Sequence, residues 1–310
     1  PYPIVPGHVS IGRLEKIRGT LLDTAGKPFA EGDRVTFLDV HKTCNRCWHC
    51  LVARASTRCP HRKVYGITYG LADGPTGGWA EKIYLKPGTH CLRVDGLDSE
   101  SFMAGGCSLP TALHAVERAT LRFADTVLVL GCGPVGLSAV AFSRLKGAGR
   151  ILCIGAPATR LEVAKSVGAD DVLDFTACSE QARRDWVLNH TSGRGADVTI
   201  EATGVAEAVT QALRWTRDAG TVVIVGQYTD AGEVSLNPHW DINKKHLDIR
   251  GCWGSDYSHF ARGIDMLRTA SARAFWSAIK LQRYTLSGAN QALADVADGT
   301  CVKALMVPTP

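Results

Sequence analysis

Four cysteines stand close together in the sequence, at Cys44, Cys47, Cys50 and Cys59. Tetrahedral zinc readily takes four thiolate sulfurs, and a C-x-x-C hook presents two of them from one tight turn. The alternative, four free cysteines that cluster by coincidence, is disfavoured by this density. Because all four coordination positions would be filled by protein, we expect a closed, structural zinc site with no open position for chemistry.

A glycine-rich turn is the second chemical signal; it reads Gly131-Cys-Gly133-Pro134-Val135-Gly136 and follows the apolar run 127–130. In this G-x-G-x-x-G pattern, Gly131 permits the tight turn, Gly133 lets the backbone approach a pyrophosphate, and Gly136 lets the following helix pack closely on the strand. The free amides and the positive dipole end at the helix start favour an anion. A glycine triad alone is a weak signal, but both the strand before it and the helix after it are present. We therefore predict a dinucleotide site that includes Pro134 and Val135.

Two kinds of secondary structure have to position these residues. The first part, up to about residue 95, reads as short strands separated by glycine and proline, at 9–17, 34–39, 79–85 and 91–94, which is typical of a small β-rich domain. Strands and helices then alternate, with predicted strands at 127–130, 151–154, 171–174, 198–201, 221–225 and 248–251. This α/β pattern predicts a Rossmann-type, doubly wound parallel sheet, after which a last strand is expected at 303–307.

The strand ends of the predicted sheet supply further cofactor candidates. Such folds bind ligands at the carboxyl ends of their strands, which brings Thr203 and Gly226 into the predicted cofactor site. The position that contacts the adenosine ribose is Gly155, so no carboxylate is there to favour NAD. Arg160 could pair with a 2′-phosphate or be a solvated residue at a helix start, and the pattern leans slightly to NADP.

Composition limits the classes of function that are possible. A chain of 310 residues with 45% hydrophobic and 21% charged residues is long enough for two globular domains. The net charge of +5 is spread along the chain, which argues against a nucleic-acid partner, and the longest apolar run is broken by Gly-Pro, which argues against a membrane span. The eleven cysteines form one cluster and otherwise scatter, which favours a reducing cytoplasm over a disulfide framework.

Taken together, the motifs resemble the zinc-dependent alcohol dehydrogenases of the medium-chain dehydrogenase/reductase superfamily. Besides the cysteine cluster and the glycine turn, the matching segments are Pro6-Gly-His8, Gly32-Asp-Arg-Val35, Gly77-Gly-Trp-Ala-Glu81 and Gly106-Cys107 with Thr111. The resemblance implies a GroES-like, β-rich catalytic domain over 1–108 and 256–310 and a Rossmann dinucleotide-binding domain over 109–255.

The resemblance also implies a second, catalytic zinc. Its ligands would be His8, Cys107 and a cysteine that has no match in this sequence and that we expect upstream of Pro1. Thr111 resembles the family threonine that touches the nicotinamide, and Val9 stands where the family has a glutamate. In this chemistry an open zinc position polarises the alcohol and lowers its pKa, so that hydride can pass to the nicotinamide.

The expected function is hydride transfer between an alcohol, or the matching aldehyde or ketone, and NAD(P), with two zinc ions per chain. Family members are usually dimers or tetramers, so we expect a homo-oligomer joined partly through strand 248–251. A zinc-independent superfamily reductase of C=C bonds should lack the cysteine cluster and the His8/Cys107 pair. A catalytically inactive relative that binds dinucleotide as a sensor or structural protein stays open, because Val9 and the unmatched first cysteine depart from the family pattern.

The sequence does not identify the alcohol. Candidate walls of the substrate pocket are Asp39, His41, Trp79 and Trp253. Each of them has an alternative role in ordinary packing, which for the two tryptophans and for His41 is the better interpretation.

Overall fold

The computed structural model describes residues 2–308 and divides into two compact units. The β-rich unit consists of Pro1–Cys107, Asp256–Thr269 and Leu281–Pro310, and the sheet unit consists of Ser108–Ser255 and Ala270–Lys280. The domain boundaries expected from the sequence place 270–280 in the β-rich domain. In the structure this segment groups with the sheet unit, because helix α9 (Ala270–Ser277) packs on helix α4 (Pro134–Leu145), which follows the glycine turn.

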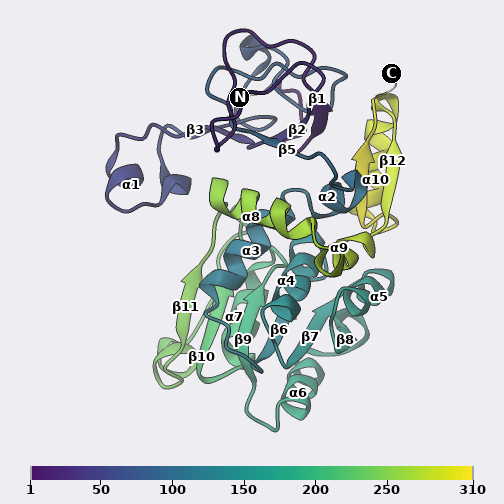
Figure 1. The fold of residues 1–310 in the computed structure, drawn as a ribbon. Helices are drawn as coiled ribbons and strands as arrows, with labels where there is room; N and C mark the ends of the chain where they lie inside the picture. The colour runs from purple at the N-terminus through teal and green to yellow at the C-terminus, as the bar shows by residue number, and fades with distance from the viewer. Residues whose placement is uncertain (1, 309–310) are drawn as a thin grey trace. The chain divides into compact units, whose positions relative to one another are not determined.

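Six parallel strands form the sheet of the sheet unit, in the order β11-β10-β9-β6-β7-β8 (Figure 1). They are β6 (Thr126–Leu130), β7 (Arg150–Gly155), β8 (Asp171–Asp174), β9 (Ala196–Glu201), β10 (Thr216–Ile224) and β11 (Asp248–Gly251). The central strand β6 is buried on both faces, which explains its unbroken apolar sequence. The predicted doubly wound α/β sheet is confirmed.

Helices cover the sheet in two groups. They are α3 (Ser108–Arg118), α4 (Pro134–Leu145), α5 (Ala158–Ser166), α6 (Glu180–His190), α7 (Ala206–Trp215) and α9 (Ala270–Ser277). α4 packs with α3, α5 and α9, whereas α6 packs with α7. The second group joins the sheet in one core, where Val187 of α6 and Leu213 and Trp215 of α7 contact apolar side chains of the strands.

The β-rich unit is built from short strands. β1 (Ile11–Arg13), β2 (Arg34–Phe37) and β5 (Cys91–Arg93) form an antiparallel sheet, and β3 (Val40–Lys42) pairs with β4 (Lys63–Val64). Phe29, Val35, Phe37, Tyr65 and Tyr69 form its core. The strand predicted at 79–85 is wrong, because the backbone there bonds to loops, as in Tyr84 N–H to Pro75 O at 2.9 Å, and joins no ladder.

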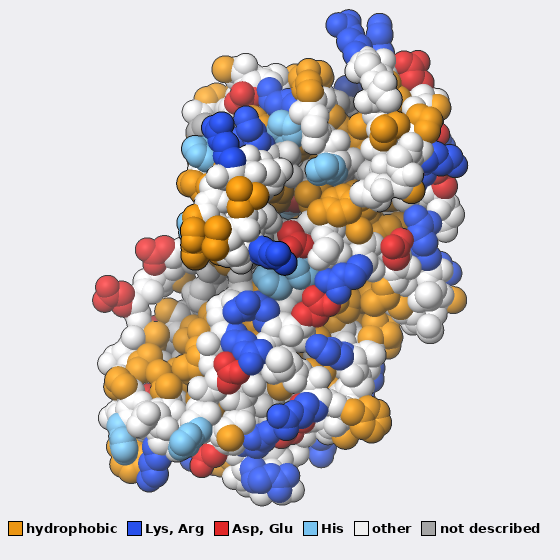
Figure 2. All heavy atoms as spheres, turned by 60° about the vertical axis from the view of Figure 1, so that its left-hand side comes forward, with side chains coloured by type: hydrophobic (Ala, Val, Ile, Leu, Met, Phe, Trp, Pro, Cys, Tyr) orange, Lys and Arg blue, Asp and Glu red, His pale blue; other side chains and the backbone are white. Residues whose placement is uncertain are grey.

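The rest of the β-rich unit comes from helices and the C-terminal segment. These elements are α1 (Trp48–Leu51), α2 (Ser99–Gly105), α8 (Tyr257–Leu267), α10 (Ala289–Ala297) and the parallel pair β12 (Leu281–Tyr284) and β13 (Lys303–Met306). Within residues 2–308, none of the helices has both the length and the apolar character that crossing a bilayer requires. On the face drawn in Figure 2, lysine and arginine side chains are interspersed with acidic, neutral and apolar ones.

Candidate functional site

The structure brings the four clustered cysteines together. One ligand atom from each of Cys44, Cys47, Cys50 and Cys59 lies within 4.8 Å of the others. Two hooks shape the cluster: the Cys50 amide donates to Cys47 O at 3.1 Å, and the Cys44 amide donates to the Cys59 sulfur at 3.3 Å. The predicted donor set for a tetrahedral zinc is therefore assembled on one short lobe, residues 44–59.

The electrostatics of this lobe fit a cation. The backbone N–H of Arg46 is the main cause that lowers the pKa of Cys44, to about 6, whereas desolvation and the hydrogen bond to Cys47 raise the pKa of Cys50 to about 12. Four thiols this close cannot all ionise unless a cation balances them. A zinc ion supplies that charge and takes thiolate ligands, so the donor set fits zinc.

His8 is held by close backbone packing in the β-rich unit. The preceding Gly7 has φ +93°, and its carbonyl accepts from the Gly78 amide at 2.6 Å. A Cβ at Gly77 would lie 1.9 Å from Val5 O, and one at Gly66 would lie 2.3 Å from Gly7 O, so both positions require glycine. The Gly77-Gly-Trp segment therefore acts as a clamp that fixes the backbone on which His8 is carried.

His8 and Cys107 lie within hydrogen-bond reach of each other. Burial lowers the pKa of His8, but the hydrogen bond with Cys107 and the charges of Cys107 and Asp39 outweigh it and raise this pKa overall. Desolvation raises the pKa of the Cys107 thiol, yet the bond with His8 and the positive charge of Lys303 lower it overall. Cys107 keeps accessible surface although the protein packed around it desolvates the thiol, so the pair is a nitrogen and a sulfur donor that solvent still reaches.

The charge of Asp39 acts on both members of this pair. Burial raises the pKa of Asp39, and the charges of His8 and Arg62 oppose that rise. Asp39 precedes β3, and its carbonyl accepts from the Tyr65 amide at 2.9 Å, which anchors it beside β4. In residues 2–308, the cysteine lobe is the one group of three or more potential ligands that lies close enough to hold a metal by itself.

The glycine turn has the geometry that its sequence predicts. Gly131 has φ +103°, and its amide donates to Ile154 O at 2.7 Å. A Cβ at Gly136 would lie 1.9 Å from Gly131 O, whereas one at Gly133 would meet open space. α4 begins at Pro134 directly after Gly133, so the amides of Val135 and Gly136 lie in its first turn, where an anion would be bound.

The ribose position is shaped by Cys132 and Arg160. A Cβ at Gly155 would lie 2.4 Å from the Cys132 sulfur, so the thiol fills the space that a side chain at Gly155 would need. Burial raises the pKa of Cys132, and the charge of Arg160 opposes that rise, which means that the guanidinium lies within electrostatic range of the turn. Asp174, the register partner of Gly155, bonds through Oδ1 to Thr176 N at 2.8 Å.

Sequence reasoning missed Glu201, which organises the loop after β9. This carboxylate is fully buried; its Oε1 accepts from Thr203 N at 2.7 Å and from Gly204 N at 3.2 Å. Its backbone carbonyl accepts from the Gly226 amide at 2.9 Å. Glu201 thus holds Thr203 and Gly226, the two predicted cofactor residues at the strand ends. One signal in the sequence could have revealed this role: Glu201 is a carboxylate at the end of a strand predicted to be buried.

The remaining candidates have varied surroundings. Thr111 lies in the first turns of α3 in the sheet unit. His41 hydrogen-bonds through Nδ1 to Tyr69 and through Nε2 to Pro87 O at 3.0 Å, and Trp79 packs against Gly7. In the sheet unit, Trp253 stacks on Tyr228 with ring centroids 5.1 Å apart. His41 and the two tryptophans therefore have packing partners of their own.

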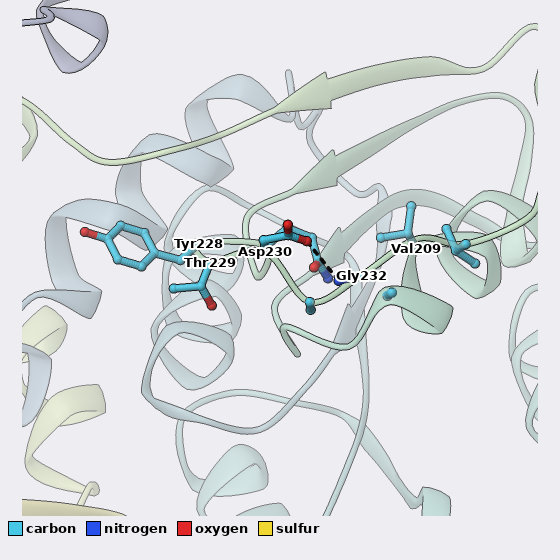
Figure 3. A pocket seen from close by; sticks show the side chains of 9 residues that line it. Val209, Tyr228, Thr229, Asp230 and Gly232 are labelled. Carbon is cyan, nitrogen blue, oxygen red and sulfur yellow. Dashed lines mark hydrogen bonds between the residues drawn. The ribbon is translucent and has the colours of Figure 1, made fainter.

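An open pocket of about 310 Å³ lies between the start of α7 and the loop 227–234 (Figure 3). Val209 lines it from α7, and Tyr228 and Asp230 line it from the loop. The Gly232 amide donates to Asp230 Oδ1 at 2.9 Å, which closes the loop on itself. None of the predicted cofactor or metal residues lines this pocket, although its lining residue Gln227 directly follows the predicted cofactor residue Gly226.

Comparisons with known proteins identify the family to which the chain belongs. Residues 1–96 match the alcohol dehydrogenase GroES-like domain, and residues 134–269 match the zinc-binding dehydrogenase family. The chain is 30% identical to 5-exo-hydroxycamphor dehydrogenase of Pseudomonas putida over 318 residues, which cover 100% of this chain and 85% of that protein.

Two solved structures extend the comparison. The crystal structure of an alcohol dehydrogenase from Thermotoga maritima superposes with a TM-score of 0.92 at 32% identity, covering 100% of this chain and 85% of that one. A zinc-binding dehydrogenase from Sinorhizobium meliloti 1021, crystallised with NADP, has a TM-score of 0.82 at 27% identity and covers 99% and 84%. The chain belongs to the zinc-dependent alcohol dehydrogenases of the medium-chain dehydrogenase/reductase superfamily, enzymes that transfer a hydride between an alcohol, or its aldehyde or ketone, and NAD(P).

Proposed function

We propose that this alcohol dehydrogenase uses two zinc ions per chain. His8 and Cys107 hold the catalytic ion, and Cys44, Cys47, Cys50 and Cys59 hold the structural one. The observation that carries the proposal is the His8–Cys107 pair, an imidazole and a thiol in hydrogen-bond contact at a solvent-accessible point. Both are ligands that catalytic zinc sites use, and two protein donors leave positions for a further ligand and for substrate.

The chain's own residues prepare the reaction. When bound, zinc acts as a Lewis acid that lowers the pKa of the alcohol hydroxyl. The glycine clamp fixes the position of His8, and Asp39 supplies negative charge beside this imidazole. In the sheet unit, the amides of Val135 and Gly136 are placed to bind the pyrophosphate of the dinucleotide. Glu201 fixes the Thr203 loop, and Thr111 is proposed to contact the nicotinamide ring.

NADP is the cofactor that we propose, with Arg160 as the residue that pairs with the 2′-phosphate. The thiol of Cys132 fills the space beside Gly155, so a carboxylate that would favour NAD does not fit there. The charge of Arg160 reaches this turn, and the similar dehydrogenase from Sinorhizobium meliloti was crystallised with NADP.

The assembly that we propose is a homodimer or homotetramer in a reducing cytoplasm. β11 is an edge strand of the sheet and its Ile249 is 36% exposed, so β11 offers unpaired backbone groups and an apolar side chain to a second copy. Within residues 2–308 none of the eleven cysteines is joined in a disulfide, as is usual for a protein of a reducing compartment.

The proposal is tested by counting metal in the full-length enzyme and in a Cys107→Ala variant. We expect about two zinc ions per chain to fall to about one, because removing a thiolate ligand empties the open site and leaves the closed one filled. Atomic absorption on dialysed protein gives the count. One zinc in both proteins would leave the His8–Cys107 pair without a metal and refute the two-zinc mechanism.

Replacing Arg160 with glutamine tests the cofactor. Charge-assisted hydrogen bonds contribute about 1.5–3 kcal/mol, so the KM for NADP should rise about 10- to 100-fold while the KM for NAD changes little. Steady-state kinetics with both cofactors provide the measurement, and Arg184→Gln on exposed α6 is the matched control. Equal increases for NAD and NADP would assign Arg160 a role in helix structure instead.

A further inference from the structure

Lys303 on β13 caps a helix far away in the sequence. Its ammonium donates to Ala104 O at 3.0 Å and to Gly105 O at 2.9 Å, 199 and 198 residues away. These carbonyls belong to the last two residues of α2, where no further turn of helix satisfies them. Lysine is a suitable partner for such carbonyls, because its charge also complements the helix dipole.

The turn after α2 is shaped around this ammonium. Gly106 has φ +50°, and its amide donates to Phe102 O at 2.7 Å, which ends the helix. A Cβ at Gly106 would lie 2.5 Å from the Lys303 nitrogen, so any side chain there would push the ammonium away. The next residue is Cys107, whose sulfur interacts electrostatically with the same ammonium.

We propose that Lys303 is a positioning residue for the zinc ligand Cys107: its ammonium fixes the Ala104–Gly106 turn that presents the sulfur to the metal. The inference rests on the proposed function, since it requires the catalytic zinc at His8 and Cys107. Lys303 itself donates to two backbone carbonyls of α2. Burial lowers the pKa of Lys303, so the proposal rests on the geometry of its two hydrogen bonds, through which it acts on the backbone of α2.

A purely structural cap and a positioning residue make different predictions. If Lys303 were only a structural cap, its removal would lower the stability of the fold and leave the rate of zinc release unchanged. A cation beside the site also repels Zn²⁺, so if repulsion dominated, removing Lys303 would slow the loss of zinc. Positioning predicts faster loss, because outer partners of a metal ligand typically change metal affinity by about 10- to 100-fold.

Lys245 provides a matched control. Its ammonium also caps a helix, donating to Leu213 O at 2.6 Å and to Arg214 O at 3.0 Å at the end of α7 and to Thr216 O at 2.5 Å, and both lysines are half-buried. It lies in the sheet unit, whereas His8 and Cys107 lie in the β-rich unit. Lys303→Met and Lys245→Met therefore remove the same kind of interaction, and only the first is next to a proposed ligand.

The experiment follows zinc release from the full-length enzyme to a chelator with a colorimetric zinc indicator. The phase that is absent in Cys107→Ala is assigned to the catalytic ion. We expect Lys303→Met to accelerate that phase about 10- to 100-fold and to alter the thiolate-to-metal absorption band of the cobalt-substituted enzyme. Lys245→Met should change neither readout, and Lys303→Arg, which keeps charge and donors, should restore part of the slow release.

The outcomes separate the two proposals. If wild type releases two zinc ions and Lys303→Met behaves like Lys245→Met, or releases its catalytic ion more slowly, the positioning role of Lys303 is overturned and the zinc site stands. If wild type holds a single zinc ion that Cys107→Ala retains, the catalytic site and the role of Lys303 are overturned together.

Discussion

Replacing His8 with alanine is expected to lower kcat/KM for alcohol oxidation by about three orders of magnitude. A metal Lewis acid supplies several kcal/mol of transition-state stabilisation, and each 1.36 kcal/mol corresponds to about a factor of ten. The clamp formed by Gly77, Gly78 and Trp79 holds the backbone at His8, so a small backbone shift does not compensate for the loss of the imidazole. Steady-state kinetics with a panel of alcohols measure the effect.

The size of the effect has to be separated from damage to the fold. Titration of the cofactor by fluorescence should give an unchanged Kd for His8→Ala, because the glycine turn belongs to the sheet unit. His61→Ala, an exposed histidine near the cysteine lobe, should keep wild-type kinetics. A decrease of less than tenfold, or a parallel weakening of cofactor binding, would remove His8 from the catalytic metal.

The second large effect is expected at the cysteine lobe, where Cys50→Ala should release one zinc ion and unfold residues 44–59 locally. In this lobe Cys59 is buried, but neither α1 nor the turn Ser56–Arg58 buries a residue. The lobe therefore has no apolar core, and under the two-zinc proposal the metal supplies its order. Structural zinc contributes about 10–16 kcal/mol in small zinc-binding peptides, more than a few exposed contacts can replace.

Limited proteolysis combined with zinc analysis measures this change. The variant should be cut within 44–59 at low protease concentration, while the wild-type lobe resists. Cys178→Ala, which removes a half-buried thiol from the sheet unit, serves as the control and should retain both zinc content and protease resistance. A Cys50→Ala enzyme with wild-type zinc content would show that the four thiols do not share a metal.

Local patterns made much of this fold predictable. The central strand β6 is buried on both faces, so its residues 127–130 form an unbroken apolar run. The glycine turn needs glycine for steric reasons that act within six residues. The cysteine cluster was predictable for the same reason, because its ligands are close in sequence. β10 begins at Thr216, earlier than the predicted strand 221–225. The irregular pairing between Thr216 and Thr221 interrupts the strand pattern, so this first part could not be predicted.

Features that depend on distant partners could not be predicted. The segment 79–85 has the composition of a strand. It joins no sheet, however, because Gly77 and Gly78 directly before it pack on the backbone that precedes His8. Glu201 looks like an ordinary charged residue until its three-dimensional neighbours are known. The role of Lys303 could not be predicted from the sequence either, because its partners Ala104 and Gly105 contribute only backbone carbonyls.

The contact between Lys303 and α2 also bears on the order in which the molecule folds. Closing a loop of 199 residues costs about 5 kcal/mol of chain entropy, and two charge-assisted bonds return about 3–6 kcal/mol, so the contact by itself has almost no net free energy with which to lead the folding reaction. The chain between these residues contains all six strands of the parallel sheet. Local pairing in that sheet and between β12 and β13 has to shorten the gap first. The turn that carries Cys107 is therefore among the last parts of the enzyme to take its final shape.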